Sequence, residues 1–417
     1  MGSAGKAAKP PTGGIGGFFQ RSWYALLVLL NATVWNMYEL FTPHKKFDVK
    51  KATRRPGENV VITGGARGIG KEIVKKLLML DLHVIMGVRN ETAAKTMVDE
   101  FRKARITTGT VDILPLDLKS FESVREFATQ VLQKYTKIHI LINNAGLYDQ
   151  PYEKTEDGYE ITFQVNYLSH FLLTNMLLPK LTYAGTSEKA SRIVNVSSIA
   201  HYPGKIDVDD IWMEKVFGQN WAYGNSKLMQ GISSKDFNDR LVKEGYPVRS
   251  FSVHPGCIAS GLYETYPKIV QGYFWLMFKN CEKGADGVLY VALSPDVEKD
   301  GGKYFQNCST FFQNSQVDNI DVQKALWEAS CKATGWKDSM NAKPKVSPNR
   351  KNTPAIVITK DSGAESISSA KSKATKDDLE RESETENETS PNEVTVSPKP
   401  TPTSKEETDT IPSVDSN

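Results

Sequence analysis

Short apolar runs rich in β-branched residues alternate with longer amphipathic segments over residues 58–336. The run 59–63, Asn-Val-Val-Ile-Thr, predicts a buried strand, and residues 70–80 carry apolar side chains such as Ile73 and Leu77 on one helical face. The alternation continues with a strand at 84–88, a helix at 91–105, and strands at 111–116, 138–143, 192–196 and 248–254. Such alternation is typical of an α/β domain with a parallel sheet between two layers of helices.

The pattern predicts a fold class, a Rossmann-type doubly wound parallel sheet forming a single domain over residues 58–336. Right-handed crossovers open the ligand crevice of such a sheet at the carboxyl ends of its strands. Nearly all of the glycine-rich and polar motifs of this domain stand at or just after predicted strand ends. We therefore expect them to meet in one site.

Residues 22–41 form a different pattern, an apolar segment without Lys or Arg. About 20 such residues are enough to cross the hydrocarbon core of a bilayer. Because Asn31, Asn36 and Glu39 interrupt the segment, three alternatives stay open: an uncleaved anchor, which we favour, an interfacial helix, and a cleaved or unanchored segment. The basic linker 42–57 predicts that the following domain faces the cytosol. We expect residues 1–21 to be a flexible N-terminus.

The composition changes again at the other end of the chain. Residues 337–417 contain no aromatic residue and are rich in Ser, Thr, Pro, Glu and Lys. A segment of this kind buries too little apolar surface to offset its conformational entropy, which predicts disorder. Its Ser-Pro and Thr-Pro pairs leave two interpretations open, a solvated tail and a phosphorylated docking segment.

Charge and cysteine usage exclude some classes of function. A net charge of +3 over 417 residues gives no reason to expect a nucleic-acid partner. The four cysteines are far apart and never form a CxxC pair. We therefore expect reduced thiols, no disulfide framework and no metal site.

A glycine-rich segment follows the first predicted strand directly. Residues 63–70 read Thr-Gly-Gly-Ala-Arg-Gly-Ile-Gly and open a helix. Glycines let the backbone turn tightly and approach a pyrophosphate, whose charge faces the positive end of the helix. The strand before and the helix after make a dinucleotide site the favoured prediction. The residues expected to contact the cofactor here are Gly64, Arg67, Gly68, Ile69 and Gly70.

The end of the second strand indicates which dinucleotide is bound. NAD enzymes usually place Asp or Glu there, whereas this chain has Arg89 and Asn90. Arg89 and Arg67 suit a 2′-phosphate, so NADP(H) is predicted over NAD(H), with a merely solvated arginine as the alternative. After the third strand, Asp117 is expected at the adenine or as a helix N-cap. After the fourth, Asn144 lies among small residues that let the cofactor approach the backbone.

Tyr223 and Lys227 stand four residues apart on a predicted helix, so they project from the same face. We expect the ammonium to lower the pKa of the phenol from about 10, which would let Tyr223 exchange a proton with an alcohol or carbonyl oxygen. The strand 192–196 leads into Ser198, which is placed to hydrogen-bond the same oxygen. The three residues predict an oxidoreductase that transfers a hydride between a nicotinamide and an alcohol/carbonyl pair.

The order of these motifs resembles the short-chain dehydrogenase/reductase family over residues 58–336. TGxxxGxG, NNAG, Ser-Ser followed by YxxxK, and a Pro-Gly loop at 255–256 occur in the family's order. The resemblance implies that Tyr223 is the acid/base, Lys227 its pKa modulator and ribose ligand, Ser198 the substrate polariser and Asn166 the anchor of a proton-relaying water. It also implies that Ile258 flanks the nicotinamide amide, and that Ser260 stands where the family often has threonine.

Finer features are similar to the retinol dehydrogenase-like branch, nearest the X-linked dehydrogenase/reductase group linked to polyprenol and dolichol metabolism. These features are the 25-residue step from Ser198 to Tyr223, the pair His201-Tyr202, and the segment 326–331. The resemblance implies a hydrophobic substrate, an alcohol and its aldehyde or ketone of retinoid, polyprenoid or steroid type.

The aromatic-rich segment 262–279 predicts a lid for such a substrate, with a core helix as the alternative. We expect membrane association, at the endoplasmic reticulum or lipid droplets, with the domain in the cytosol. The family resemblance implies dimers or tetramers, and a homodimer is the form we name. The competing hypothesis is a catalytically silent dinucleotide-binding scaffold that recruits partners through its tail. The presence of both Tyr223 and Lys227 favours the enzyme.

Overall fold

The computed structural model describes residues 33–34, 47–258, 268, 271–272, 275 and 278–337. These residues belong to one compact unit, residues 1–346. The predicted N-terminus 1–21, the apolar segment 22–41 apart from two residues, and the tail beyond residue 337 lie outside the described residues. Within the described part of the chain, no helix combines the length and the apolar character needed to cross a membrane.

The described residues form an eight-stranded sheet. Its spatial order is β3 (Thr110–Pro115), β2 (His83–Val88), β1 (Asn59–Thr63), β4 (Ile140–Asn143), β5 (Ser191–Val196), β6 (Val248–His254), β7 (Tyr304–Gln306) and β8 (Ser309–Phe311). All neighbours are parallel except β7 and β8, which are antiparallel. The order reverses between β1 and β4, and a parallel sheet opens its ligand crevice at such a point.

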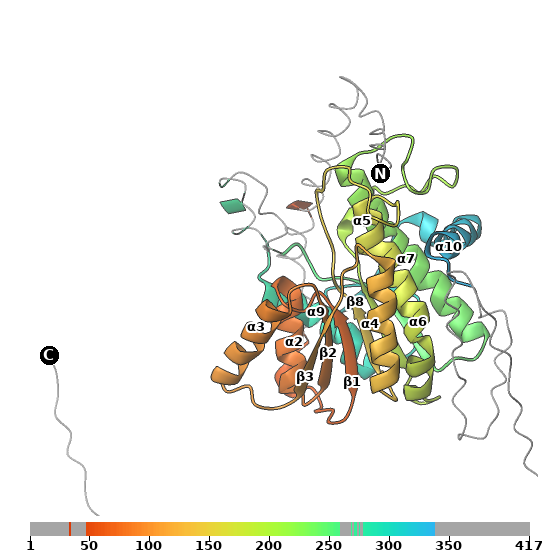
Figure 1. Cartoon of the computed structure of the whole chain (residues 1–417). Helices are drawn as coiled ribbons and strands as arrows, with labels where there is room; N and C mark the ends of the chain where they lie inside the picture. Colours follow the sequence, from red (N-terminus) through yellow and green to blue (C-terminus); the bar gives the residue numbers. More distant parts are fainter. Residues whose placement is uncertain are drawn as a thin grey trace, which may run out of the picture. The chain divides into compact units, whose positions relative to one another are not determined.

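Helices cover both faces of the sheet (Figure 1). One face carries α2 (Gly68–Met79), α3 (Glu91–Lys103) and α9 (Cys281–Leu293). The other carries α4 (Phe121–Lys134), α6 (Ser169–Ala184) and α7 (Gln219–Lys243), with α10 (Ile320–Thr334) packed outside them. A single turn, α5 (Ile161–Phe163), and a π-helical turn, η2 (Gln164–Leu168), lead into α6. Short 3-10 turns are η1 (Val49–Lys51), η3 (Ile199–His201), η5 (Pro295–Val297) and η6 (Ser315–Asp318).

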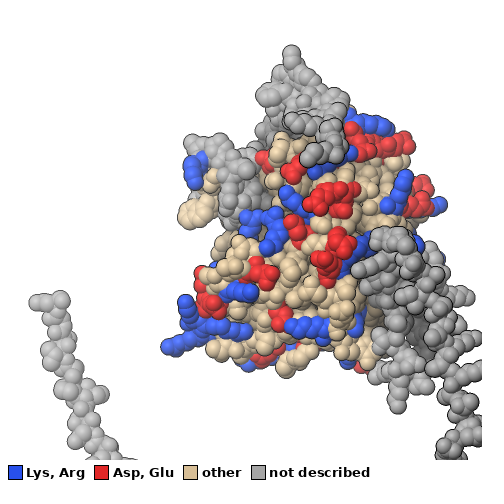
Figure 2. Space-filling view, in the orientation of Figure 1, with Lys and Arg blue, Asp and Glu red and all other residues tan. Residues whose placement is uncertain are grey.

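The strands β1, β2 and β4 are largely apolar because both of their faces are buried. Val60 and Ile62 of β1 belong to the core under α2, α3 and α9, whereas Val61 between them belongs to the core under α4, α6 and α7. All three side chains are fully buried. On the face drawn in Figure 2, acidic and basic groups are interspersed.

The predicted α/β class is confirmed, and the six predicted strands occur within two residues of their expected bounds. The helices expected at 70–80 and 91–105 are α2 and α3. The sequence did not predict β7 and β8, which have three residues each. Such short runs carry no readable period, and here they are defined by pairing with β6 and with each other.

Candidate active site

A cleft of about 780 Å³ lies at the carboxyl ends of the parallel strands. The segments that follow the strands form its walls: 64–70, 87–90, 116–119, 144–148, 196–200 and 254–258. Every predicted cofactor and catalytic residue lines this cleft except Asn166, which is fully buried behind it, and Ser260, which lies outside the described residues. Sequence positions up to 214 residues apart, Gly64 and Phe278, therefore share one site.

The glycine loop leaves backbone where side chains would block the cleft. Gly64 has φ +68°, and a Cβ there would lie 2.9 Å from Ala145 in the loop after β4. A Cβ on Gly70 would lie 2.2 Å from the Gly64 carbonyl oxygen. The N-cap of α2, Arg67, gives the helix no side-chain hydrogen bond, so the first-turn amides remain for an anion at the cleft. This cradle fits the diphosphate of a dinucleotide.

Thr63 joins the loops after β1 and β4. Its hydroxyl oxygen accepts hydrogen bonds from the backbone N–H groups of Asn144 at 3.1 Å and Ala145 at 3.0 Å. The side-chain amide of Asn144 donates to the carbonyl oxygens of Thr63 and Gly64. Asn144 thus holds the two loops together as well as lining the cleft.

Arg67 and Arg89 stand on the rim of the cleft where β1 and β2 end. Both side chains are exposed, and within the described part of the chain they hold no carboxylate partner. Asn90, also on the rim, caps α3 by accepting from the Ala93 N–H at 2.9 Å. Two unpaired guanidinium groups and no acidic side chain at the end of β2 make this rim suited to a phosphate.

Asp117 lines the cleft after β3, and one of its carboxylate oxygens accepts from the Lys119 N–H at 2.9 Å. The alternative that Asp117 caps the next helix is wrong. The N-cap of α4 is Ser120, whose hydroxyl accepts from the Ser123 N–H. The helix begins three residues later than an Asp117 cap would place it.

Tyr223 lies in the first turns of α7 with its ring buried in the cleft wall. The ring of Tyr148 packs edge-on against it, with centroids 4.8 Å apart. Burial raises the pKa of Tyr223 to about 12, although a hydrogen bond with the Ser198 side chain opposes this shift. The expectation that Lys227 lowers this pKa is wrong for this arrangement, because desolvation of the phenol dominates.

Lys227 lies one turn further along α7 and is also buried. Its ammonium donates to the Val196 carbonyl oxygen at 2.8 Å and to the Gln230 side-chain oxygen at 3.1 Å. The nitrogen is 5.7 Å from the centroid of the Tyr223 ring. Desolvation lowers the pKa of Lys227 to about 7, so the group changes charge near neutral pH.

Asn166 lies in the π-helical turn η2, and every polar atom of its side chain is bonded. The side-chain oxygen accepts from the Leu147 N–H at 2.7 Å, and the nitrogen donates to the Leu147 carbonyl and to the Ser226 hydroxyl. Its backbone carbonyl accepts from the Gln230 side chain at 2.8 Å. Asn166 therefore ties the loop after β4 to α7. A water-holding role remains a prediction.

Ile258 is buried in the cleft wall after β6, beside Gly284, whose Cβ would lie 2.6 Å from the Ile258 side chain. Most of the predicted lid, 262–279, lies outside the described residues. The sequence did not single out Tyr148, Gln230 or Cys257 as parts of the site. Two of them carried a readable signal, since Tyr148 follows the NNAG segment and Gln230 stands one helical turn after Lys227.

Comparisons with known proteins agree with this geometry. The family model described as short chain dehydrogenase matches residues 58–266. Polyprenol dehydrogenase of Danio rerio is 34% identical over 305 residues, which covers 72% of this chain and 93% of the relative. Retinol dehydrogenase 12 of Mus musculus is 37% identical over 284 residues, covering 67% of this chain and 87% of the relative.

A solved structure of an uncharacterized protein from Mycobacterium paratuberculosis superposes with a TM-score of 0.56 at 28% identity, covering 70% of this chain and 98% of that protein. Its fold therefore extends over the sheet and helices that carry the cleft. The match over residues 58–266 includes the glycine loop, the Ser198–Tyr223–Lys227 group and Ile258. The chain belongs to the short-chain dehydrogenase family of oxidoreductases.

Proposed function

We propose that this protein is an NADP(H)-dependent oxidoreductase that interconverts a hydrophobic alcohol with its aldehyde or ketone, using Tyr223 as acid/base. The observation that carries the proposal is that the Tyr223 phenol and the Ser198 hydroxyl line the same cleft as the glycine loop, near enough that Ser198 lowers the pKa of Tyr223 against the effect of burial. Two hydroxyl groups at one point can both contact a single substrate oxygen. Ser198 polarises that oxygen, and Tyr223 exchanges the proton.

The nicotinamide, when bound, supplies the hydride for reduction or accepts it in oxidation. A phenol whose pKa is raised to about 12 is protonated at neutral pH, so Tyr223 starts as the proton donor that carbonyl reduction needs. Lys227 holds its position through the Val196 carbonyl and presents its remaining N–H to the cleft, where a ribose hydroxyl would bind. The protonated phenol of Tyr223 and the position of Lys227 therefore favour carbonyl reduction over alcohol oxidation.

The choice of NADP(H) rests on Arg67 and Arg89, whose exposed guanidinium groups border the cleft beside the end of β2. A planar guanidinium binds a phosphate through paired hydrogen bonds, whereas the ribose hydroxyls of NAD(H) favour a carboxylate. The remaining predicted contacts are Asp117 with the adenine and Ile258 with the nicotinamide amide.

The substrate class is proposed from the names of the relatives and the apolar wall of the cleft. The relatives are polyprenol and retinol dehydrogenases. Leu147, Tyr148, Ile199 and Phe278 line the part of the cleft around Tyr223 and Cys257. A retinoid, polyprenoid or steroid-like lipid fits such a surface. Association with the endoplasmic reticulum or lipid droplets, a cytosolic domain and a homodimer are proposed from the sequence alone.

The test is a turnover screen with the full chain. NADPH oxidation is followed by absorbance in the presence of retinoid, polyprenoid and steroid aldehydes and ketones, with NADH in parallel. We expect turnover with NADPH and a loss of at least about 100-fold in kcat for Tyr223→Phe, since general acid catalysis contributes about 10²–10⁴. Tight NADPH binding without turnover on any substrate would instead favour the scaffold hypothesis.

A further inference from the structure

Gln230 lies one turn beyond Lys227 on α7 and is only 3% exposed, yet it does not line the cleft. Its side-chain oxygen accepts from the Lys227 ammonium at 3.1 Å, and its nitrogen donates to the Asn166 carbonyl at 2.8 Å. The side chain therefore bridges two of the residues proposed to act in catalysis. We propose that Gln230 is a positioning residue that holds the Lys227 nitrogen against Asn166 and controls how readily Lys227 keeps its proton; this rests on the proposed function.

The orientation of the Gln230 amide is determined by its neighbours. An ammonium can only donate and a carbonyl can only accept, so the amide oxygen must face Lys227 and the amide nitrogen must face Asn166. A flipped amide would place donor against donor and acceptor against acceptor. Gln230 thus presents a neutral acceptor to Lys227.

The Asn166 carbonyl oxygen accepts a second hydrogen bond, from His170. Thr63 accepts from two backbone N–H groups, so its own hydroxyl hydrogen is left to donate to His170 Nε2 at 2.9 Å. His170 Nδ1 then carries the proton and donates to the Asn166 carbonyl at 3.1 Å. Because Gln230 donates to the other lone pair, both lone pairs of this carbonyl oxygen accept hydrogen bonds from protein donors. The amide of Gln230 cannot be displaced without leaving a buried acceptor short of a partner.

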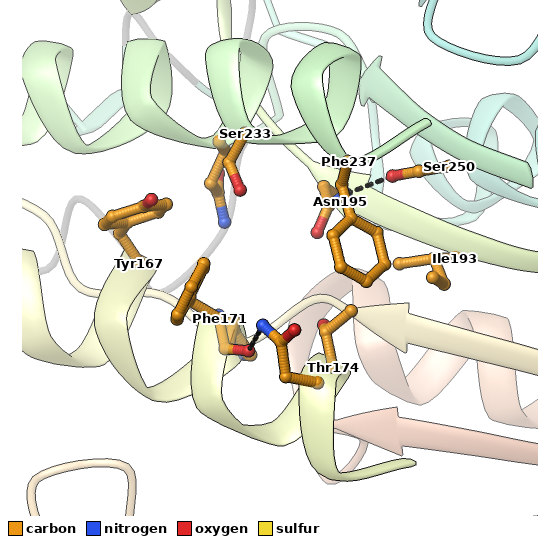
Figure 3. Close-up of a pocket in the computed structure, with 11 residues that line it drawn as sticks. Tyr167, Phe171, Thr174, Ile193, Asn195, Ser233, Phe237 and Ser250 are labelled. Atoms are coloured by element: carbon orange, nitrogen blue, oxygen red, sulfur yellow. Dashed lines mark hydrogen bonds between the residues drawn. The ribbon is translucent and has the colours of Figure 1, made fainter. Parts of the chain in front are cut away.

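The side of Gln230 away from the cleft is polar but uncharged. It borders a small cavity of about 20 Å³ between α6, α7 and the strands β5 and β6 (Figure 3). Figure 3 shows Thr174, Asn195, Ser233 and Ser250 around this cavity, and none of its lining residues is acidic. Within the described part of the chain, therefore, no carboxylate near Gln230 compensates the charge of Lys227.

Among the described residues, three titratable groups face Lys227 from the surrounding elements: Tyr223 on α7, His170 on α6 and His254 at the end of β6. Burial raises the pKa of Tyr223 to about 12, lowers that of His170 to about 4, and lowers that of His254 well below its ordinary value. None of the three changes charge between pH 6 and 9. Of these three groups and Lys227, only Lys227 titrates in that range.

The test compares Gln230→Leu, which removes the acceptor, with Gln230→Glu, which puts an anion in its place. Reduction should slow as pH rises through the pKa of Lys227. We expect this fall in kcat to move to lower pH by about 1 unit in the leucine variant, because a hydrogen bond to a charged group is lost. In the glutamate variant it should move to higher pH by about 1–3 units. The KM for NADPH should change little.

A second readout needs neither cofactor nor substrate. Labelling of Lys227 by acetic anhydride, followed by mass spectrometry across the same pH range, reports directly on its free amine. The matched control is Gln323→Leu, which removes a buried amide that donates to the Val317 carbonyl at 2.6 Å. This control should leave both profiles at the wild-type position.

Opposite shifts in the two Gln230 variants support the proposal, since loosened packing would move both in the same direction. Profiles that coincide with wild type, or that move the same way, overturn it. If the leucine variant does not fold, the upward shift in the glutamate variant decides alone. If the wild type turns over no substrate, the proposed function fails, but the labelling profiles still decide the role of Gln230.

Discussion

Thr63, the last residue of β1, joins three segments through one fully buried hydroxyl group. Its oxygen accepts from the Asn144 and Ala145 N–H groups, and its hydrogen goes to His170 Nε2. Valine has nearly the same shape as threonine and suits a strand, so Thr63→Val removes the three hydrogen bonds while leaving the packing in place. The variant isolates the contribution of the hydroxyl to stability and to the cleft.

The expected loss follows from the number of bonds. A net contribution of about 1 kcal/mol for each gives about 3 kcal/mol in the free energy of unfolding. The two backbone N–H groups are only partly buried, so water from the cleft can reach them and the loss should not grow far beyond this value. The higher strand propensity of valine returns a few tenths of a kcal/mol at most, on a scale of about 1 kcal/mol.

The control is Thr63→Ser, which keeps the hydroxyl and removes one buried methyl group at a cost of about 1 kcal/mol. Urea denaturation of the full chain, followed by far-ultraviolet circular dichroism, measures both variants. NADPH titration should show weaker binding in the valine variant, since the loops after β1 and β4 both line the cleft. If the Thr63→Val variant proved as stable as Thr63→Ser, or more stable, the Thr63 hydroxyl would not join these segments. The assignment of the proton to Nδ1 of His170 would then be wrong as well.

The remaining predictions concern charge. Replacing Arg89 or Arg67 with glutamine should raise the Kd for NADPH by about 10–100-fold while leaving NADH nearly unchanged, because only NADPH has the 2′-phosphate; equal losses in fluorescence titrations with both nucleotides would refute the phosphate assignment. Arg192, 4% exposed, donates to Glu298 at 2.7 Å and to the Val291 carbonyl. Glu298→Gln should therefore destabilise the fold by about 3 kcal/mol in urea denaturation, because it leaves a buried cation unpaired. Arg192→Met should cost only about 1 kcal/mol, since Glu298 is partly exposed and can turn to water; the reverse ranking would contradict this account.

The sheet could be predicted because its signal is local. Strands buried on both faces are continuous apolar runs, and Val60, Val61 and Ile62 stand out without knowledge of their neighbours. Motifs at strand ends could likewise be assigned to one site, because parallel strands bring their carboxyl ends to one edge. β7 and β8 escaped prediction because each has only three residues and because β7 pairs with β6, about 50 residues away, while β8 depends on β7.

The electrostatic state of the site could not be predicted in the same way. The spacing of Tyr223 and Lys227 indicates that the two groups are neighbours, but it carries no information on desolvation. Burial raises the first pKa and lowers the second, which outweighs the expected effect of the ammonium on the phenol. The depth of burial depends on Tyr148, Val196 and Cys257, which come from three different strand ends.

The contacts of Thr63 and Gln230 form one continuous chain of hydrogen bonds. From Thr63 it passes to His170 at 2.9 Å, to the Asn166 carbonyl at 3.1 Å, to Gln230 at 2.8 Å and to Lys227 at 3.1 Å. It starts at the glycine loop and ends at the proposed catalytic amine, and each inner member is at most 3% exposed. In such a low-dielectric network the bonds polarise one another, so changes at the two ends should not be additive. The position of Lys227 is therefore tied to the loop that would hold the diphosphate, although Thr63 and Lys227 are 164 residues apart in the sequence.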